Sequence, residues 1–432
     1  MANLNENSTN YVHSYEPNTN DLTMAMEYEE DGKPVLRVNL GSVDTTSKAR
    51  TKVSNSETYM FSNTTYDIQA TEWDYSTANG ATVVYNTTSG GTELTVAAQA
   101  GSEAIMETRR VVPYMPGRTS EMTIAVQFGP ELEGVRRRIG AFDENDGIFF
   151  EQDGVDYYCV IRSSTSGAPV ERRIHRDNWT DDHFDGTDSH GLVADPTKIQ
   201  LMTIEWDWYG AGDVIFSFTM EGYKHTVHRE HNANRIVGAW MRHPTNPVRI
   251  EITNTDGVGT HTMTKYGMSA GFEGHTTNIG RAGSITSPVG GMRLTAAGTY
   301  YPVVAIKLKD TRLKSVVIPT ALSVASLDQS IVYWRLLSIP DDTYLTGGTW
   351  VDYSTDSYVQ YNLTATGYTD GAIIQQGFAS AASGLYRKLE EVALWQMKRN
   401  NMGTDSEVLL LACAGYSPNV DVFGLLEWIE AR

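Results

Sequence analysis

The sequence predicts an all-β protein with two antiparallel β-sandwich domains of the jelly-roll or lectin type and an extended N-terminal arm. Its 432 residues exceed the usual size of one hydrophobic core, which favours more than one domain. Residues that favour strands are abundant, with 23 Tyr and 9 Trp, and 38 Gly punctuate the short apolar runs. Helical periodicity is scarce, and no repeat of about 20 to 50 residues indicates a solenoid or propeller.

The N-terminal residues 1–54 are predicted to form a polar arm. Asn, Ser and Thr dominate this stretch, and its few apolar residues are scattered, as in a segment that docks on a partner to become ordered. A short polar segment buries too little area to offset the entropy of its own ordering. We therefore expect the arm to dock on another subunit.

The first β-sandwich is predicted over residues 55–270. Eight runs of strand length in this region have alternating or continuous apolar positions. Eight such strands suit a two-layered antiparallel sandwich. The runs are 92–99, 122–128, 147–152, 155–163, 199–208, 213–220, 223–230 and 248–253.

A linker rich in Gly, Ser and Thr is predicted at 271–291, where large apolar residues are few. A second β-sandwich is predicted over 292–432, which again carries apolar runs of strand length. Within it, the stretch 385–399 fits either the one candidate helix or a strand.

The net charge argues against two classes of partner. Asp and Glu number 53 against 34 Lys and Arg, a formal charge of -19 that repels nucleic acid and anionic membranes. No apolar run approaches the roughly 18 to 20 residues of a membrane-spanning helix. Residues 1–20 lack the pattern of a secretory signal. We therefore expect neither nucleic acid nor a membrane as partner, and folding in a cytosol.

The two cysteines, Cys159 and Cys413, each lie in an apolar run and are expected to behave as small buried side chains. Two cysteines exclude a disulfide framework. A single bridge between them stays open at this point.

The segment 142–154, FDENDGIFFEQDG, gathers carboxylates around two Asp-Gly pairs. Counted from Asp143, it fails the EF-hand pattern, because Gly falls at position 5 and position 12 is not Glu. A cation site of another kind, built from Asp143, Asn145, Asp146 and Asp153, is one interpretation. The other is a pair of tight turns around a short strand, since Asp-Gly supplies the positive φ that such turns need.

Two carboxylate pairs have the spacing of one strand face: Glu151 with Asp153, and Glu205 with Asp207. Retaining glycosidases hold two carboxylates about 5 Å apart. The second pair resembles the E-x-D-x-E strand of laminarinase-like sandwiches, whose outer glutamates carry the chemistry, but the third acidic position here is Tyr209. The alternative is a strand with an ordinary polar face. No catalytic residue, metal ligand or cofactor is assigned from the sequence.

Three tryptophans are candidate glycan contacts: Trp206, Trp208 and Trp350, each close to acidic residues. Exposed aromatic side chains on a sandwich can stack on sugar rings. The alternative is ordinary strand packing, with Trp206 and Trp208 buried on the face opposite the carboxylates.

Several long segments carry a family resemblance. They include YMPGRTSEMTIAVQF, GVRRRIGAFDENDGIFFEQDG, HREHNAN and NPVRIEITN, and, more loosely, YPVVAIKLK and SEVLLLACAG. Over roughly residues 50–430 the chain resembles a family of virion structural proteins of tailed bacteriophages, notably marine and cyanobacterial ones, described as structural or tail-fibre-like.

The resemblance implies a non-enzymatic structural component of a virion, displayed as a capsid decoration, neck, baseplate or fibre protein and assembled in the host cytoplasm. It implies a homo-oligomer, a trimer or higher, with other virion proteins as partners and with no cofactor. Two alternatives stay open. One is a host-glycan-binding module on a fibre, with a host surface glycan as partner, and the other is a glycoside hydrolase or depolymerase.

Overall fold

The chain divides into two compact units, residues 1–55 and residues 56–432. In the first unit, three strands form an antiparallel sheet, and they are the described part of the predicted arm, 1–54. These strands are β1 (Tyr11–Val12), β2 (Thr23–Tyr28) and β3 (Pro34–Asn39). The computed structural model describes residues 11–12, 23–28, 34–39, 56–188, 191–207, 210–274, 280–327, 330–379, 384–389 and 396–431.

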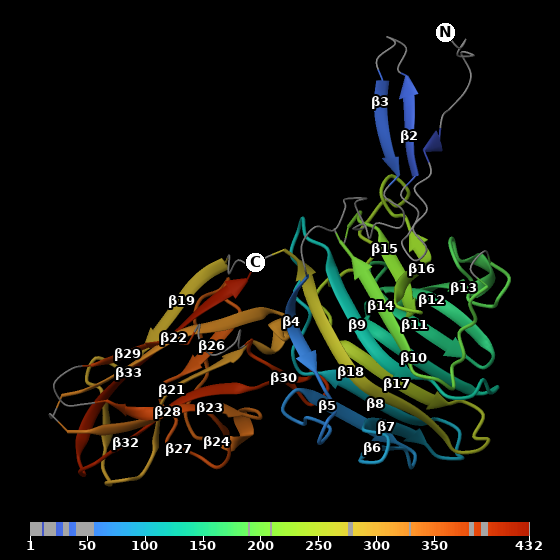
Figure 1. The fold of residues 1–432 in the computed structure, drawn as a ribbon. Coiled ribbons are helices and arrows are strands. Elements are labelled where there is room, and N and C mark those ends of the chain that lie inside the picture. Colours follow the sequence, from blue (N-terminus) through green and yellow to red (C-terminus); the bar gives the residue numbers. More distant parts are fainter. Residues whose placement is uncertain are drawn as a thin grey trace. The chain divides into compact units, whose positions relative to one another are not determined.

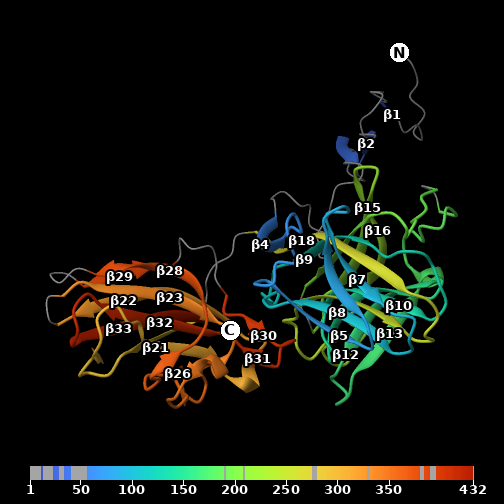
Figure 2. The same ribbon diagram turned by 90° about the horizontal axis from the view of Figure 1, so that it is seen from below.

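The second unit begins with a sandwich of a seven-stranded and an eight-stranded antiparallel sheet (Figures 1 and 2). The seven-stranded sheet, in the order β13-β12-β11-β10-β17-β8-β5, contains β5 (Trp73–Ala78), β8 (Ser102–Thr108), β10 (Val135–Phe142), β11 (Gly147–Asp153), β12 (Asp156–Ser163), β13 (Val170–His175) and β17 (Val248–Asn254). The eight-stranded sheet, in the order β16-β15-β14-β9-β18-β7-β6 with β4 on β18, contains β4 (Ser56–Ser62), β6 (Thr82–Asn86), β7 (Gly91–Val96), β9 (Ser120–Gln127), β14 (Gln200–Trp206), β15 (Val214–Met220), β16 (Tyr223–Glu230) and β18 (His261–Glu273).

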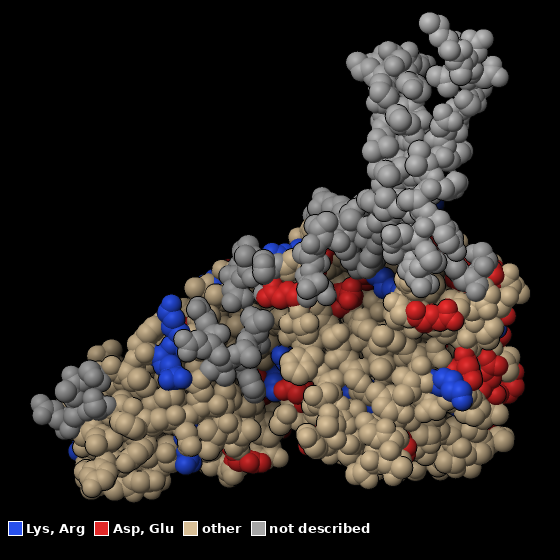
Figure 3. Space-filling view, in the orientation of Figure 1, with Lys and Arg blue, Asp and Glu red and all other residues tan. Residues whose placement is uncertain are grey.

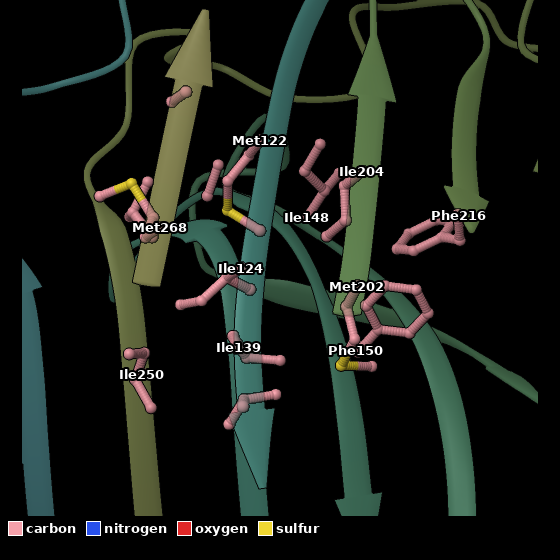
Figure 4. Close-up of a cluster of buried hydrophobic side chains, with 14 of the residues drawn as sticks. Met122, Ile124, Ile139, Ile148, Phe150, Met202, Ile204, Phe216, Ile250 and Met268 are labelled. Atoms are coloured by element: carbon pink, nitrogen blue, oxygen red, sulfur yellow. The ribbon is translucent and has the colours of Figure 1, made fainter. Parts of the chain in front are cut away.

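The core of this sandwich follows from the two-residue period of its strands. Every second residue of β9 is buried, and on β14, where nearly every residue is buried, Met202 and Ile204 belong to the apolar core. Figure 4 shows Met122 and Ile124 of β9 beside Ile139 of β10, within one apolar cluster supplied by both sheets. Each such side chain contributes roughly 1.5 to 3 kcal/mol by leaving water. The residues between them are left on the outer faces.

A second sandwich follows, with its own apolar core. Its five-stranded sheet contains β19 (Gly280–Thr286), β20 (Met292–Leu294), β22 (Val316–Ser326), β29 (Leu385–Lys388) and β33 (Val420–Ala431). Its six-stranded sheet contains β21 (Tyr301–Leu308), β23 (Val332–Ile339), β25 (Val351–Asp352), β26 (Val359–Asn362), β28 (Ala372–Ala379) and β32 (Val408–Gly415). Shorter elements are the pairs β24 (Leu345–Thr346) with β27 (Gly367–Tyr368) and β30 (Arg399–Asn400) with β31 (Asp405–Ser406), and the 3-10 turns η1 (Arg176–Asn178), η2 (Asp310–Arg312) and η3 (Asp342–Tyr344).

The all-β sandwich prediction is confirmed. The structure also bears on two local predictions. The stretch predicted as a linker, 271–291, contains strand β19, where Gly283 lies against Trp428 so closely that a Cβ would come within 2.4 Å of the ring. The ambiguous stretch 385–399 begins with strand β29, and its residues 390–395 lie outside the described ones.

Two further features bear on the sequence predictions. Cys159 and Cys413 are both buried free thiols, one in the core of each sandwich. Among the described residues, no helix is long and apolar enough to span a membrane.

Candidate functional site

The outer face of the eight-stranded sheet carries polar side chains from two neighbouring strands, β9 and β14. Met122 and Ile204, which are next to Glu121 and Glu205 in the sequence, point into the core. Because successive side chains of a strand alternate, Glu121 and Glu205 are on the opposite face. The hydroxyl oxygens of Thr123 and Thr203, 2.9 Å apart, confirm that the two strands present this face together. Figure 1 shows β9 and β14 side by side in this sheet.

Glu121 is directly opposite Glu205 in the antiparallel register of β9 and β14. Directly opposite residues have Cβ atoms about 4.5 to 5.5 Å apart, and like charges in this position destabilise a sheet. Retaining glycosidases hold their two carboxyl groups about 5 to 5.5 Å apart. The register therefore makes Glu121 and Glu205 direct cross-strand neighbours.

The two glutamates have different surroundings. Glu205 is 1% exposed, and its Oε1 accepts a hydrogen bond at 3.1 Å from the Nζ of Lys224, which reaches across from β16. Glu121 is half-buried. Glu205 is thus the buried member of the pair, and it contacts a lysine ammonium.

Asp207, the other carboxylate of the predicted pair, is 2% exposed just after β14. It lies against the backbone of the next turn, so that a Cβ on Gly212 would come within 2.0 Å of its Oδ1. The side chain of Asp207 is enclosed by that turn, and we assign it a structural role in holding the turn.

The predicted glycan contacts are dispersed. Trp206 is 2% exposed in the core of the first sandwich, as the packing alternative expected. Trp350 is half-buried in the second sandwich, where the Nζ of Lys307 lies 5.2 Å from the centroid of its ring. Trp208 lies outside the described residues. The described tryptophans of this set do not form one platform.

The first predicted carboxylate pair, Glu151 with Asp153, belongs to an ion network on the outer face of the seven-stranded sheet. Glu151 is 1% exposed and is bound by the guanidinium groups of Arg138 and Arg173. Arg138 also pairs with Glu251 at 3.1 Å, and Arg173 with Asp153 at 2.6 Å. These carboxylates are neutralised by protein cations, which suits a structural role.

The four predicted cation ligands do not converge. The ammonium of Lys314 pairs with Asp143, whose Oδ1 also accepts hydrogen bonds from the backbone N–H groups of Asn145 and Asp146. Burial raises the pKa of Asp143, but Lys314 and these N–H groups outweigh it and hold the pKa below its usual value. Asp153 lies at the opposite end of β11.

The carboxylate of Asp146 is likewise occupied. It accepts hydrogen bonds from the backbone N–H and the hydroxyl of Ser164 and from the backbone N–H of Arg242, and the Nδ1 of His243 lies 3.2 Å away. Within the described residues, no group of three or more His, Cys, Asp and Glu side chains is arranged to hold a metal ion.

Sequence reasoning found Glu205 but missed Glu121 and Lys224. Glu121 directly precedes a predicted strand, and the alternation of that strand places it on the polar face. What the sequence does not contain is the register of β9 against β14, which makes Glu121 the neighbour of Glu205. Lys224 joins them from β16, with β15 in between.

No family model matches the chain, and no curated protein matches it either. Among solved structures, it is similar to a glycoside hydrolase family protein from Mycobacterium thermorestibile, with 11% identity and a TM-score of 0.35 over 49% of this chain and 99% of that one. A beta-1,3-glucanase from Mycobacterium marinum matches with 11% identity and a TM-score of 0.34 over 50% of this chain and 100% of that one. A family 43 glycoside hydrolase from Bacillus licheniformis has 11% identity and a TM-score of 0.32 over 58% of this chain and 46% of that one.

These matches concern the fold, and they correct one expectation. The sequence analysis expected a non-enzymatic protein, whereas the solved structures named above, which the chain resembles in fold alone, are glycoside hydrolases.

Proposed function

We propose that the first sandwich is a glycoside hydrolase that acts through Glu121 and Glu205. The observation that supports this most directly is the register that sets the two carboxyl groups opposite each other on an outer sheet face. Glu205, paired with Lys224, is the nucleophile, and Glu121 is the general acid and base.

In the first step, a Glu205 oxygen attacks the anomeric carbon while Glu121 gives its proton to the departing glycosidic oxygen. The bond to the leaving sugar breaks and a covalent glycosyl ester forms. In the second step, Glu121 takes a proton from water, the water oxygen attacks the same carbon, and Glu205 is released. The anomeric configuration is retained.

The surrounding surface supports a sugar chain as the substrate. Beside the two glutamates, the hydroxyl groups of Thr123 and Thr203 are hydrogen-bonded to each other, and Thr123 is the more exposed of the two. Figure 3 shows that charged side chains are scattered over the visible described surface, with uncharged residues between them. Hydroxyl-rich ligands find both donors and acceptors on such a surface.

The test is release of reducing ends from a panel of neutral and acidic polysaccharides. The active substrate is then given to Glu205→Gln, Glu121→Gln and, as a control, Glu93→Gln, which changes another glutamate of the same sheet that bonds Asn86. We expect losses of at least about 1,000-fold for the first two, in line with the loss of a catalytic group, and an unchanged rate for the control. Full activity in either of the first two variants would overturn the assignment.

A second measurement separates the roles of the two glutamates. Azide, a small nucleophile, is added to Glu205→Ala and to Glu121→Ala. With Glu205→Ala, azide takes the place of the nucleophile and gives a glycosyl azide of inverted configuration. With Glu121→Ala, it takes the place of the activated water and gives the retained product. If Glu205→Ala gave the retained product and Glu121→Ala the inverted one, Glu121 would be the nucleophile and Glu205 the general acid and base.

We further propose that the protein is carried on the particle of a tailed phage as a homo-oligomer. The support is the resemblance of long segments such as GVRRRIGAFDENDGIFFEQDG to virion proteins. A polysaccharide-cleaving module there would act on the host surface. Mass spectrometry of purified particles tests the location, and absence of the chain from mature particles would contradict it.

A further inference from the structure

A polar cleft of about 480 Å³ lies in the second compact unit, away from the glutamates on the eight-stranded sheet. Its floor combines Glu107 and Arg249 of the first sandwich with Arg399 of β30. Its rim includes Glu144, His243 and the 3-10 turn η2. The volume is within the range of about 300 to 1,000 Å³ typical of small-molecule sites.

The floor of the cleft is built from buried ion pairs. An Nη2 atom of Arg399 lies 3.1 Å from Glu107, and Arg249 lies 3.6 Å from the same carboxylate. All three side chains are 5% exposed or less. The floor thus offers fixed guanidinium donors next to carboxylate acceptors, because each side chain is held by its neighbours.

The rim is more accessible than the floor. Glu144 is 64% exposed although its two oxygens accept hydrogen bonds from Arg249 at 2.8 and 2.7 Å. His243 is 51% exposed and Asp310 is 75% exposed. Each of them also contacts a buried side chain, Arg249, Asp146 and Lys307 respectively, so that the rim offers exposed polar atoms in fixed positions.

The charges in the cleft balance. Four carboxylates and four Lys or Arg side chains line it, so that the net charge is zero with His243 neutral. A balanced site gives no preference to an anion or a cation. An apolar ligand would remove water from the charged groups without replacing its hydrogen bonds, at a cost of several kcal/mol. A neutral molecule with many hydroxyl groups can donate to the carboxylates and accept from the guanidinium groups.

We propose that this cleft is a binding site for a neutral oligosaccharide. Adjacent hydroxyl groups of one sugar would bridge the carboxylate of Glu107 and the guanidinium group of Arg249. The site lies apart from Glu121 and Glu205 and does not depend on their catalytic role.

The experiment measures binding of three neutral probes, maltotriose, cellotriose and laminaritriose, by titration calorimetry. The protein is the full chain with Glu121→Gln and Glu205→Gln together, so that no probe is cleaved. On this background Thr311→Trp fills the rim of the cleft with a large side chain at an exposed position. The matched control is Val289→Trp, at a residue that is 99% exposed and does not line the cleft.

We expect at least one probe to bind, with affinity at least tenfold lower in Thr311→Trp and unchanged in Val289→Trp. Glu144→Gln, which keeps the shape of the rim, is expected to weaken binding by a smaller factor. Three results would overturn the proposal. They are no binding of any probe, equal affinity in Thr311→Trp and the control, or binding of tri-galacturonate with none of the neutral sugars. If the natural chain has no hydrolase activity and the cleft still binds a probe in this manner, only the proposed function is refuted.

Discussion

The stability of the first sandwich should depend on pH through one buried lysine. Lys265, on β18, is 0% exposed, and its Nζ donates a hydrogen bond to Ser62 at 3.0 Å and lies 4.3 Å from the centroid of the Trp73 ring. Burial lowers its pKa from 10.5 to about 7. Each pKa unit corresponds to about 1.4 kcal/mol, so keeping Lys265 protonated in the folded chain costs about 5 kcal/mol.

The direction in which stability changes with pH follows from proton binding. Between about pH 7 and pH 10.5 the unfolded chain holds one more proton on this lysine than the folded chain does. Stability therefore rises with pH over this window, and the cost is complete below pH 7. Lys265→Met removes the cost together with the hydrogen bond to Ser62, which contributes about 1 kcal/mol. Ser62 keeps its hydrogen bonds with Trp73 and Gln69.

Lys265→Met should thus be more stable than the natural chain by about 3 kcal/mol at pH 7 and less stable by up to about 1 kcal/mol at pH 10.5, with equality near pH 10. The measurement is unfolding by guanidinium chloride, followed by tryptophan fluorescence, at pH 7, 9 and 10.5. The control is Lys198→Met, which replaces an exposed lysine. A stability difference that is the same at all three pH values, or a loss at pH 7, would refute the reasoning.

Four other predictions can be checked on the same material. Asp146→Asn should lower the free energy of unfolding by about 2 to 3 kcal/mol at pH 7 and by less below pH 4, because the hydrogen bonds that outweigh burial keep the pKa of Asp146 below its usual value; equal losses at both pH values would contradict this. Arg138→Met should cost about 2 to 3 kcal/mol, since it removes one of the guanidinium partners of the buried Glu151 and Glu251, which keep Arg173 and Arg249, whereas a loss below 1 kcal/mol would show that the network is dispensable. Cys159 and Cys413 should react with a thiol reagent only after unfolding, because burial raises the pKa of both thiols; fast labelling of the native chain would be inconsistent with that. Glu121→Gln should abolish hydrolysis while the unfolding free energy stays within about 1 kcal/mol of the natural chain's, as for a conservative substitution at a half-buried position, and a larger loss of stability would attribute the lost activity to unfolding.

The strands could be predicted because their signal is local. Alternation in residues 122–128 and 213–220 follows from the two faces of a single strand, and both stretches are strands in the structure. Strand β19 was missed because its glycines are required by packing against a strand that is distant in the sequence. Gly283 accommodates the ring of Trp428, which nothing in the neighbouring residues reveals.

The site was harder to predict for the same reason. The acidic loop around Asp143 was expected to attract a cation, and the structure supplies one from the second sandwich, the ammonium of Lys314. The partner of Glu205 was expected two residues along the same strand, whereas Glu121 comes from the neighbouring strand. Both errors concern which distant residue completes a local cluster, and that depends on strand order and register.

The two outer faces of the first sandwich arrange their carboxylates differently. On the seven-stranded sheet, Arg138 is directly opposite both Glu151 and Glu251, so that this cross-strand row alternates in charge and stabilises the sheet. On the eight-stranded sheet, Glu121 and Glu205 are directly opposite each other, and the cation that pairs with Glu205, Lys224, comes from β16, outside this row. The row itself therefore brings two carboxylates together, which is the arrangement that the proposed hydrolysis requires.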